Sequence, residues 1–180
     1  VYGYSPRMRF DLYINMFAGM ALTKKKIQLN SDGTAWRPNL YIGDIARVLH
    51  AVLNYNFEKP TIINVGNENS NIQVVNAVDI IKKHEKGVTT CLLQSKNKNL
   101  YGDQYVTSKT DKRSYKVDFS KINYLFGLDV CSTDIEEGIS KLIHELKTVD
   151  NLENKIKDKH FFRLQWTQEL IKNNLINGCA

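Results

Sequence analysis

The sequence predicts an α/β fold on three observations. Residues 44–53 place apolar side chains at the i, i+3, i+4 spacing of a helix with one buried face. Residues 61–66 are rich in β-branched side chains, which is typical of a buried strand. The two kinds of segment continue to alternate along the chain. Because the strands are few and the loops long, we expect one layer or half of an α/β fold rather than a complete doubly wound sheet.

The first third of the chain predicts a helix, a strand and a second helix. Residues 10–21 carry aromatic and aliphatic side chains at helical spacing, and the lysines at 24–26 suit the end of a helix, where cations are stabilising. Residues 26–29 are a predicted strand that ends in a polar turn. The second helix begins at Asp44, where a carboxylate stabilises the first turn, so we assign Asp44 no acid–base role. Its apolar face consists of Ile45, Val48, Leu49, Val52 and Leu53.

The rest of the chain continues this alternation. The predicted elements are a strand at 61–66, a helix at 71–84, a strand near 89–94, a polar irregular stretch at 95–114, a short helix at 119–126 and a helix from 135 to 146. Ser70 with Gln73, and Thr133 with Glu136, have the spacing of capping boxes that open two of these helices. Gly127 is placed to end the short helix.

The composition divides the chain into three parts. Residues 1–147 hold the alternating elements, and residues 148–159 read as a charged linker. Residues 160–180 contain a final helix, from 160 to 174, whose aromatic side chains are expected to pack back on the body.

Charge and cysteine content limit the classes of function. The formal net charge of +6 favours an anionic partner, which leaves nucleic acid, an acidic lipid surface and a phosphorylated small molecule open. Cys91, Cys131 and Cys179 have neither Cys-x-x-Cys spacing nor a histidine cluster, so we expect no metal site, no disulfide and a reducing cytoplasm. The sequence has no apolar run of about 20 residues, the length that a membrane span needs, and no signal-peptide pattern, so we expect no membrane partner.

Arg37 is the first candidate binding residue. It follows the turn Asp32-Gly33, which lets the chain reverse so that a guanidinium points back into a cleft, where it can grip a phosphate at two points. Taken without other information, a solvated arginine on the surface is the favoured explanation of this residue, ahead of a phosphate ligand.

Four stretches of the sequence resemble one known family. They are "VYGYSPR", "IQLNSDGTAWRPNLYIGDIARVLHAVL", "INVGNENSN" and "DKRSYKVDFSKINYLFGLDVCSTDIEEGISKLI". In this order they are similar to the C-terminal half of the NAD-dependent sugar-nucleotide epimerases and dehydratases, the extended short-chain dehydrogenases. The resemblance covers nearly all of residues 1–147 and implies the substrate-binding part of a Rossmann-like fold. The N-terminal NAD-binding part is then expected to be absent from this chain.

The resemblance implies roles for five substrate-binding residues. Arg37 and Arg113 correspond to the arginines that bind the diphosphate of a nucleotide sugar, although Arg113 could simply pair with a nearby carboxylate. Gln28 and Asn30 lie on the strand that runs beside the nucleobase, or they form the outer face of an edge strand. Asn15 corresponds to a position near the sugar or phosphate, or it is a polar residue on the exposed side of its helix.

The resemblance also implies where the cofactor lies. Tyr2, Gly3, Ser5 and Pro6 correspond to the loop that passes the nicotinamide end of NAD, although Gly and Pro there also suit a simple turn. No two of the ten glycines have G-x-G spacing, so we expect NAD to be bound mainly by the part upstream of Val1.

The catalytic Tyr-x-x-x-Lys pair of the family is also expected upstream of Val1, so no catalytic residue is assigned here. A match to that pattern, Tyr105 to Lys109, lies in the polar stretch after Arg37 instead of on a helix before it, and we assign it no catalysis.

These points predict the nucleotide-sugar-binding half of an NAD-dependent epimerase or dehydratase, inactive as the 180-residue chain alone. The expected partner is a nucleoside-diphosphate sugar, and the intact enzyme is expected to be a cytoplasmic homodimer. One alternative is a non-catalytic member of the same fold that binds a nucleotide or docks a partner. The other is a basic nucleic-acid-binding module that uses Lys24, Lys25 and Lys26, which the scattered basic residues argue against.

Overall fold

The computed structural model describes residues 1–92 and 113–176. Its elements are, in order, α1 (Tyr13–Lys24), β1 (Lys26–Leu29), β2 (Trp36–Pro38), α2 (Ile42–Leu53), β3 (Asn71–Gln73), α3 (Val74–His84), β4 (Thr89–Leu92), α4 (Ser120–Phe126), α5 (Ile135–Lys147), α6 (Leu152–Lys155) and α7 (Arg163–Lys172). Short 3-10 helices cover Glu68–Ser70, Leu128–Cys131 and Lys159–Phe161. The predicted α/β class is confirmed.

The described strands form two small sheets. β1 and β4 are parallel, with Ile27 opposite Thr90. β2 and β3 are antiparallel, with Arg37 opposite Ile72. Parallel pairing requires a crossover, and the chain between β1 and β4 supplies it with helices, as an α/β fold demands.

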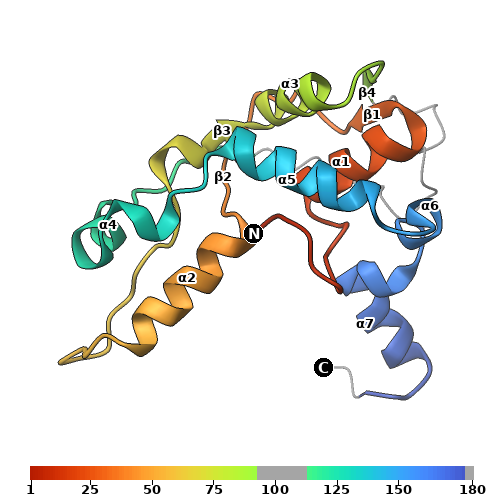
Figure 1. Ribbon diagram of the computed structural model, residues 1–180. Coiled ribbons are helices and arrows are strands. Elements are labelled where there is room, and N and C mark those ends of the chain that lie inside the picture. The colour runs from red at the N-terminus through yellow and green to blue at the C-terminus, as the bar shows by residue number, and fades with distance from the viewer. Residues whose placement is uncertain (93–112, 177–180) are drawn as a thin grey trace.

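The helices α1, α3 and α5 lie together as a layer, and the remaining helices extend from its two ends. Figure 1 shows α2 and α4 at one end and α6 and α7 at the other. This arrangement separates the apolar side chains into two clusters. The first cluster joins α1, α3, α5 and β1 around Ile14, Ile27, Ile81 and Leu142. The second cluster, which is smaller, joins α2, α4 and the 3-10 helix before α5 around Val48, Phe119, Ile122 and Val130.

The first predicted helix and the predicted strand at 61–66 differ from the structure. The first helix covers Tyr13–Lys24 rather than 10–21, and it ends at Lys25, whose φ of 50° is left-handed. The predicted strand at 61–66 is wrong, because among the described residues no strand pairs with this stretch. The predicted strand near 89–94 is confirmed for Thr89–Leu92, and the irregular stretch at 95–114 lies mostly outside the described residues.

The predicted capping boxes use different residues. α3 begins at Val74 because residues 71–73 pair with β2, and Asn76 Oδ1 accepts a hydrogen bond from the Gln73 amide at 3.1 Å. α5 is capped by Asp134, which accepts from the Glu136 amide at 2.7 Å. Each predicted box therefore lies a few residues from the cap that forms.

The C-terminal part packs on the body at both of its predicted segments. Residues 148–159, predicted as a charged linker, include α6, and Ile156 is buried in the first cluster. The final helix, α7, begins at Arg163 rather than at residue 160, and none of its own residues is fully buried. Phe162, just before it, is buried in the first cluster, and the Trp166 ring lies against His160 with ring centroids 3.9 Å apart. Across the described ranges, no helix has the length and apolar character needed to cross a membrane.

Candidate functional site

β2 places Arg37 beside a segment from much later in the chain. The Arg37 guanidinium donates to the Trp36 carbonyl at 2.8 Å and to the backbone carbonyl of Arg113. It also lies 5.4 Å from the centre of the Tyr115 ring. The structure thus brings the two predicted diphosphate-binding arginines together, although 76 residues separate them.

Residues 113–117 run along β2 and β3 and are held there by hydrogen bonds. The Trp36 amide donates to Ser114 Oγ at 3.1 Å, and the Tyr115 amide donates to the Trp36 carbonyl at 3.3 Å. At the far end, the Asn71 side chain accepts from the Val117 amide and donates to the Val117 carbonyl, both at 2.9 Å. Asn71 is itself buried, so its amide replaces the backbone bonds that a neighbouring strand would make.

The same segment adds a second cation over an aromatic ring. Lys116 Nζ lies 3.7 Å from the centre of the Trp36 ring, within the range of a cation–π contact. We call the five residues Trp36, Arg37, Arg113, Tyr115 and Lys116 the cationic–aromatic cluster. The Arg37 guanidinium and the Lys116 ammonium thus lie over two flat rings, with the Arg113 backbone beside them, an arrangement that suits a ligand that has phosphates and a heterocycle.

Two polar residues support Arg37: the half-buried Tyr13 on α1 and the buried Asn39 after β2. Tyr13 donates its hydroxyl to Asn39 Oδ1 at 2.8 Å, and Asn39 Nδ2 donates to the Arg37 carbonyl at 2.9 Å. Burial raises the pKa of Tyr13, and the hydrogen bond to Asn39 and the charge of Arg37 oppose this only in part. The phenol therefore stays protonated near neutral pH and acts as a donor.

The structure places Asn15, Tyr2 and Gly3 in the interior. Asn15 Oδ1 accepts from the Gly3 amide at 3.0 Å, and Asn15 Nδ2 donates to the Arg9 carbonyl at 2.9 Å. Gly3 has a φ of 122°, and a Cβ there would lie 2.6 Å from Ile42 Cγ2. The oxygen and the nitrogen of the Asn15 side chain thus both hold the N-terminal loop in place. The predicted contact of Asn15 with a ligand stays a prediction.

The other predicted contacts are spread over the described surface and core. Gln28 is buried on β1 and Asn30 is exposed after it. Ser5 is half-buried, with its carbonyl accepting from the Met8 amide at 3.0 Å, and Pro6 is exposed. The ligand roles of these four residues stay predictions, and Tyr105 and Lys109 lie outside the described residues.

The lysines proposed for a nucleic-acid interface are engaged in part with carboxylates. Lys24 forms an ion pair with Glu153, and Lys25 forms one with Glu85. These pairs neutralise two of the three charges at the end of α1, which weakens them as phosphate contacts.

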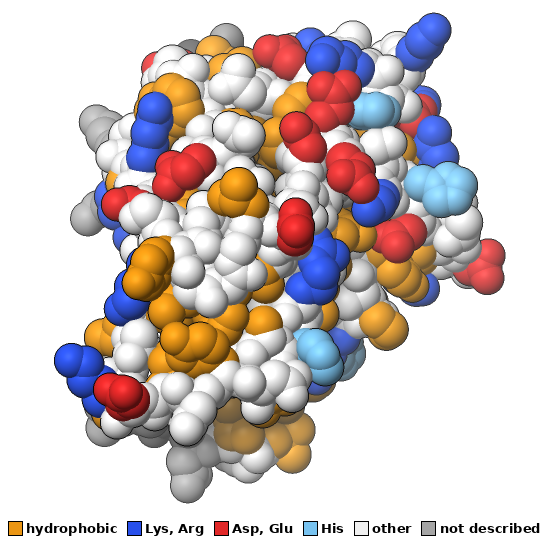
Figure 2. Space-filling model, turned by 60° about the vertical axis from the view of Figure 1, so that its left-hand side comes forward, with side chains coloured by type: hydrophobic (Ala, Val, Ile, Leu, Met, Phe, Trp, Pro, Cys, Tyr) orange, Lys and Arg blue, Asp and Glu red, His pale blue; other side chains and the backbone are white. Residues whose placement is uncertain are grey.

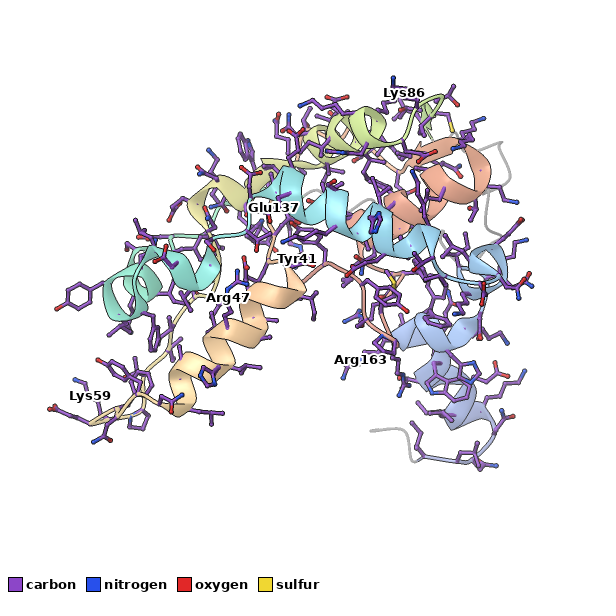
Figure 3. All side chains as sticks on the ribbon, viewed as in Figure 1. Tyr41, Arg47, Lys59, Lys86, Glu137 and Arg163 are labelled. Atoms are coloured by element: carbon purple, nitrogen blue, oxygen red, sulfur yellow. The ribbon has the colours of Figure 1, made fainter. Side chains whose placement is uncertain are left out.

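The junction of α2 with α5 contains a buried carboxylate. Asp44 is 2% exposed, accepts from the Thr133 hydroxyl at 2.5 Å and pairs with Arg47. Figure 3 shows Tyr41 and Arg47 at the start of α2, with Glu137 nearby on α5. Since its partners are side chains of the fold, Asp44 ties the start of α2 to the segment that leads into α5.

Sequence reasoning missed the aromatic half of the cationic–aromatic cluster. Tyr115 and Lys116 directly follow Arg113 and Ser114, and Trp36 directly precedes Arg37. An aromatic residue next to a basic one in both segments was the available signal, because rings beside cations are typical of nucleotide and nucleic-acid binding.

Two of the four residues predicted to pass the nicotinamide end of NAD, Tyr2 and Gly3, are buried. A dinucleotide site needs a glycine-rich turn that opens a helix, and Gly3, the only glycine of the predicted cofactor loop, has its amide bonded to Asn15. Tyr2 is 4% exposed and packs edge-on against Tyr41. Only Ser5 and Pro6 of the predicted loop reach the surface. We therefore derive no chemical step through NAD from this chain.

Comparison with known proteins agrees with the geometry. Residues 1–66 match the model of the NAD dependent epimerase/dehydratase family, a range that includes Arg37. The solved structure of TunA, an NAD-dependent NDP-hexosamine 5,6-dehydratase involved in tunicamycin biosynthesis, is similar with a TM-score of 0.65 and 20% identity. That match covers 82% of this chain and 44% of TunA.

A second solved structure shows the same likeness. The dTDP-glucose 4,6-dehydratase RfbB from Bacillus anthracis, solved in complex with NAD, is similar with a TM-score of 0.60 and 18% identity. That match covers 87% of this chain and 45% of RfbB. The chain thus spans less than half the length of either enzyme, and over that length it has the fold of a sugar-nucleotide dehydratase.

Proposed function

We propose that this chain is the nucleotide-sugar-binding portion of an NAD-dependent epimerase or dehydratase. In this proposal Arg37 and Arg113 bind the diphosphate, and the neighbouring rings of Trp36 and Tyr115 border the nucleoside. Support comes from the family match over residues 1–66 and from the fold shared with two nucleotide-sugar dehydratases. The NAD-binding portion and the catalytic Tyr-x-x-x-Lys pair belong to a polypeptide that lies outside this sequence.

The observation that carries the proposal is the contact between Arg37 and the backbone of Arg113. A diphosphate has two charged groups, and charge-assisted hydrogen bonds from guanidinium are about twice as strong as neutral ones. Lys116, over the Trp36 ring, adds a third cation to the same place.

The contribution of this chain to catalysis is then positioning. Holding the diphosphate at two points fixes where the sugar lies relative to the rest of the active site, which lowers the entropic part of the barrier. NAD, when bound by the other portion, supplies oxidation and reduction of the sugar. The 180-residue chain alone is expected to bind nucleotide sugar and to leave it unchanged.

Titration calorimetry of the 180-residue chain with UDP, dTDP, GDP, CDP and ADP tests the site. We expect at least one of these to bind more tightly than its monophosphate. Arg37→Ala should then weaken that binding by about 1.5 to 3 kcal/mol, the range for a hydrogen bond to a charged group, or about 10- to 150-fold in Kd.

Arg163→Ala is the matched control, since Arg163 is an exposed arginine at the start of α7, away from β2 (Figure 3). It should leave the affinity unchanged. If no diphosphate binds, or if Arg37→Ala and Arg163→Ala give the same Kd, the role assigned to Arg37 is wrong.

A further inference from the structure

Asn39 lies one residue beyond β2 and uses its backbone and its side chain to hold the end of that strand. Its backbone amide donates to the Ser70 carbonyl at 3.0 Å, which extends the pairing of β2 with β3 by one step. Its side-chain Nδ2 donates to the same carbonyl at 3.0 Å and to the Arg37 carbonyl at 2.9 Å. Both N–H groups of this side chain are therefore used, and one of them holds the backbone at Arg37.

Tyr13 fixes the orientation of the Asn39 side chain from α1. Its hydroxyl donates to Asn39 Oδ1 at 2.8 Å across 26 residues of sequence. Asn39 is 8% exposed, so water has little access to this oxygen, and without the hydroxyl it would be buried without a donor. Rotation of the amide would turn the same oxygen toward two carbonyl oxygens. Tyr13 thus stabilises the one orientation in which Asn39 holds Arg37.

The Tyr13 ring is itself held in place by its own helix. Tyr13 is the first residue of α1 and packs edge-on against Phe17, with ring centroids 5.8 Å apart. Both residues contact the first cluster, to which the buried Phe17 belongs. A chain of contacts therefore leads from this cluster through Tyr13 and Asn39 to the backbone of Arg37.

We propose that Tyr13 is a positioning residue of the diphosphate site, which acts through Asn39 on the backbone of Arg37. This rests on the function proposed above. The Arg113 carbonyl holds the guanidinium end of Arg37, and the Tyr13–Asn39 pair holds its backbone end. A binding group must be kept within about 0.5 Å of its productive place by residues around it, and Tyr13 supplies this support from outside the cationic–aromatic cluster.

Hydrogen exchange followed by NMR on the recombinant 180-residue chain tests the link without any ligand. Tyr13→Phe removes the hydroxyl and keeps the ring that packs against Phe17. We expect the amides of residues 37 and 39 to exchange about 2- to 12-fold faster, the equivalent of one hydrogen bond between neutral groups. Unchanged exchange at these amides would overturn the proposal.

Tyr124→Phe is the matched control for the loss of a phenol hydroxyl. Tyr124 is 88% exposed on α4, at the end of the molecule that comes forward in Figure 2. Because its side chain faces water, the substitution should leave exchange at residues 37 and 39 unchanged. Equal acceleration by Tyr13→Phe and Tyr124→Phe would contradict a specific link through Asn39.

Titration calorimetry with UDP, dTDP, GDP, CDP and ADP tests the consequence for binding. Tyr13→Phe should raise the Kd of the diphosphate that binds most tightly by about 2- to 12-fold. In the Arg37→Ala background it should raise the Kd no further, because the residue through which Tyr13 acts has lost its guanidinium. A purely structural role would add its loss to that of Arg37→Ala, and this result would overturn the proposal.

The same titrations separate this proposal from the proposed function. If Arg37→Ala weakens binding and Tyr13→Phe does not, the proposed function stands and the role of Tyr13 is wrong. If none of the five nucleotides binds to the wild-type chain, the proposed function is wrong and the role of Tyr13 is wrong with it.

Discussion

Asp44 is a buried carboxylate whose partners are side chains that hold two helices together. The Thr133 hydroxyl and the Arg47 guanidinium both donate hydrogen bonds to the Asp44 carboxylate. Thr133 lies in the segment that leads into α5. A carboxylate without such partners would be costly to bury. The three residues together therefore fix the position of α2 relative to α5.

Asp44→Ala should lower the free energy of unfolding by about 1.5 to 3 kcal/mol, the range for hydrogen bonds to a charged group, because Thr133 then lies buried without its acceptor. Urea denaturation measures the change. Asp79→Ala, at an exposed position on α3, is the control and should change it by less than about 0.5 kcal/mol. If both substitutions lower the free energy of unfolding by the same amount, Asp44 does not stabilise the packing of the two helices.

The residues of the candidate site could be predicted only in part. Arg37 and Arg113 were chosen from a family pattern, and the structure brings them into contact. Trp36, Tyr115 and Lys116 were missed because their importance comes from pairing across 76 residues or more, which no local pattern reports. Asn71 was missed for the same reason, since a single asparagine has no sequence signature for the segment that it holds.

At the scale of elements, the helices were predicted well and the strands less well. α2 and α5 follow from apolar periodicity, which is a local property of the sequence. Residues 61–66 have the composition of a strand, but a strand needs a partner, and none of the described residues provides one. β3 was missed because three residues before α3 pair with β2, so tertiary contact overrode the helical pattern that began at residue 71.

The packing of α5 against the N-terminal segment depends on a residue without a side chain. A Cβ at Gly138 would overlap the Tyr2 hydroxyl, which has no hydrogen-bond partner among the described residues. Gly138→Ala should therefore destabilise the protein by about 1 to 3 kcal/mol, the cost of overpacking, although alanine is the better helix former. Thermal unfolding measures the change.

Tyr2→Phe should cost little by itself and should recover part of the loss caused by Gly138→Ala, since it removes the nearest of the overlapping atoms and leaves the ring carbon Cζ 2.9 Å from the added Cβ. The control is Ser140→Ala on the same helix, which should not destabilise. If the double variant is as unstable as Gly138→Ala, the hydroxyl is not the cause.

At the scale of the whole molecule, Glu85 joins three elements of the first layer. It lies at the end of α3, accepts from Lys147 at the end of α5 at 2.8 Å, and pairs with Lys25 after α1. The hydrogen bonds from Lys147 and then Lys25 lower the pKa of Glu85 below its ordinary value of 4.5. A lowered pKa in the folded state means stability that is complete above 4.5 and is lost as the pH falls through the folded-state pKa.

Glu85→Gln should therefore reduce the free energy of unfolding at about pH 7, and its difference from the wild type should shrink as the pH falls toward about 3. Urea denaturation across this pH range measures both proteins. Glu58→Gln, an exposed residue after α2, is the control and should show no such trend. A difference that stays constant with pH would mean that the ion pairs do not provide the stability.

The two hydrogen bonds between the Asn71 side chain and the Val117 backbone make residue 71 a position where substitution is expected to be poorly tolerated. One amide side chain sets where residues 113–117 lie, and these carry three members of the cationic–aromatic cluster. Under the proposed function, a substitution at Asn71 is expected to weaken nucleotide binding although Asn71 itself does not contact the nucleotide. Selection for nucleotide binding is therefore expected to act on this interior asparagine as strongly as on the arginines.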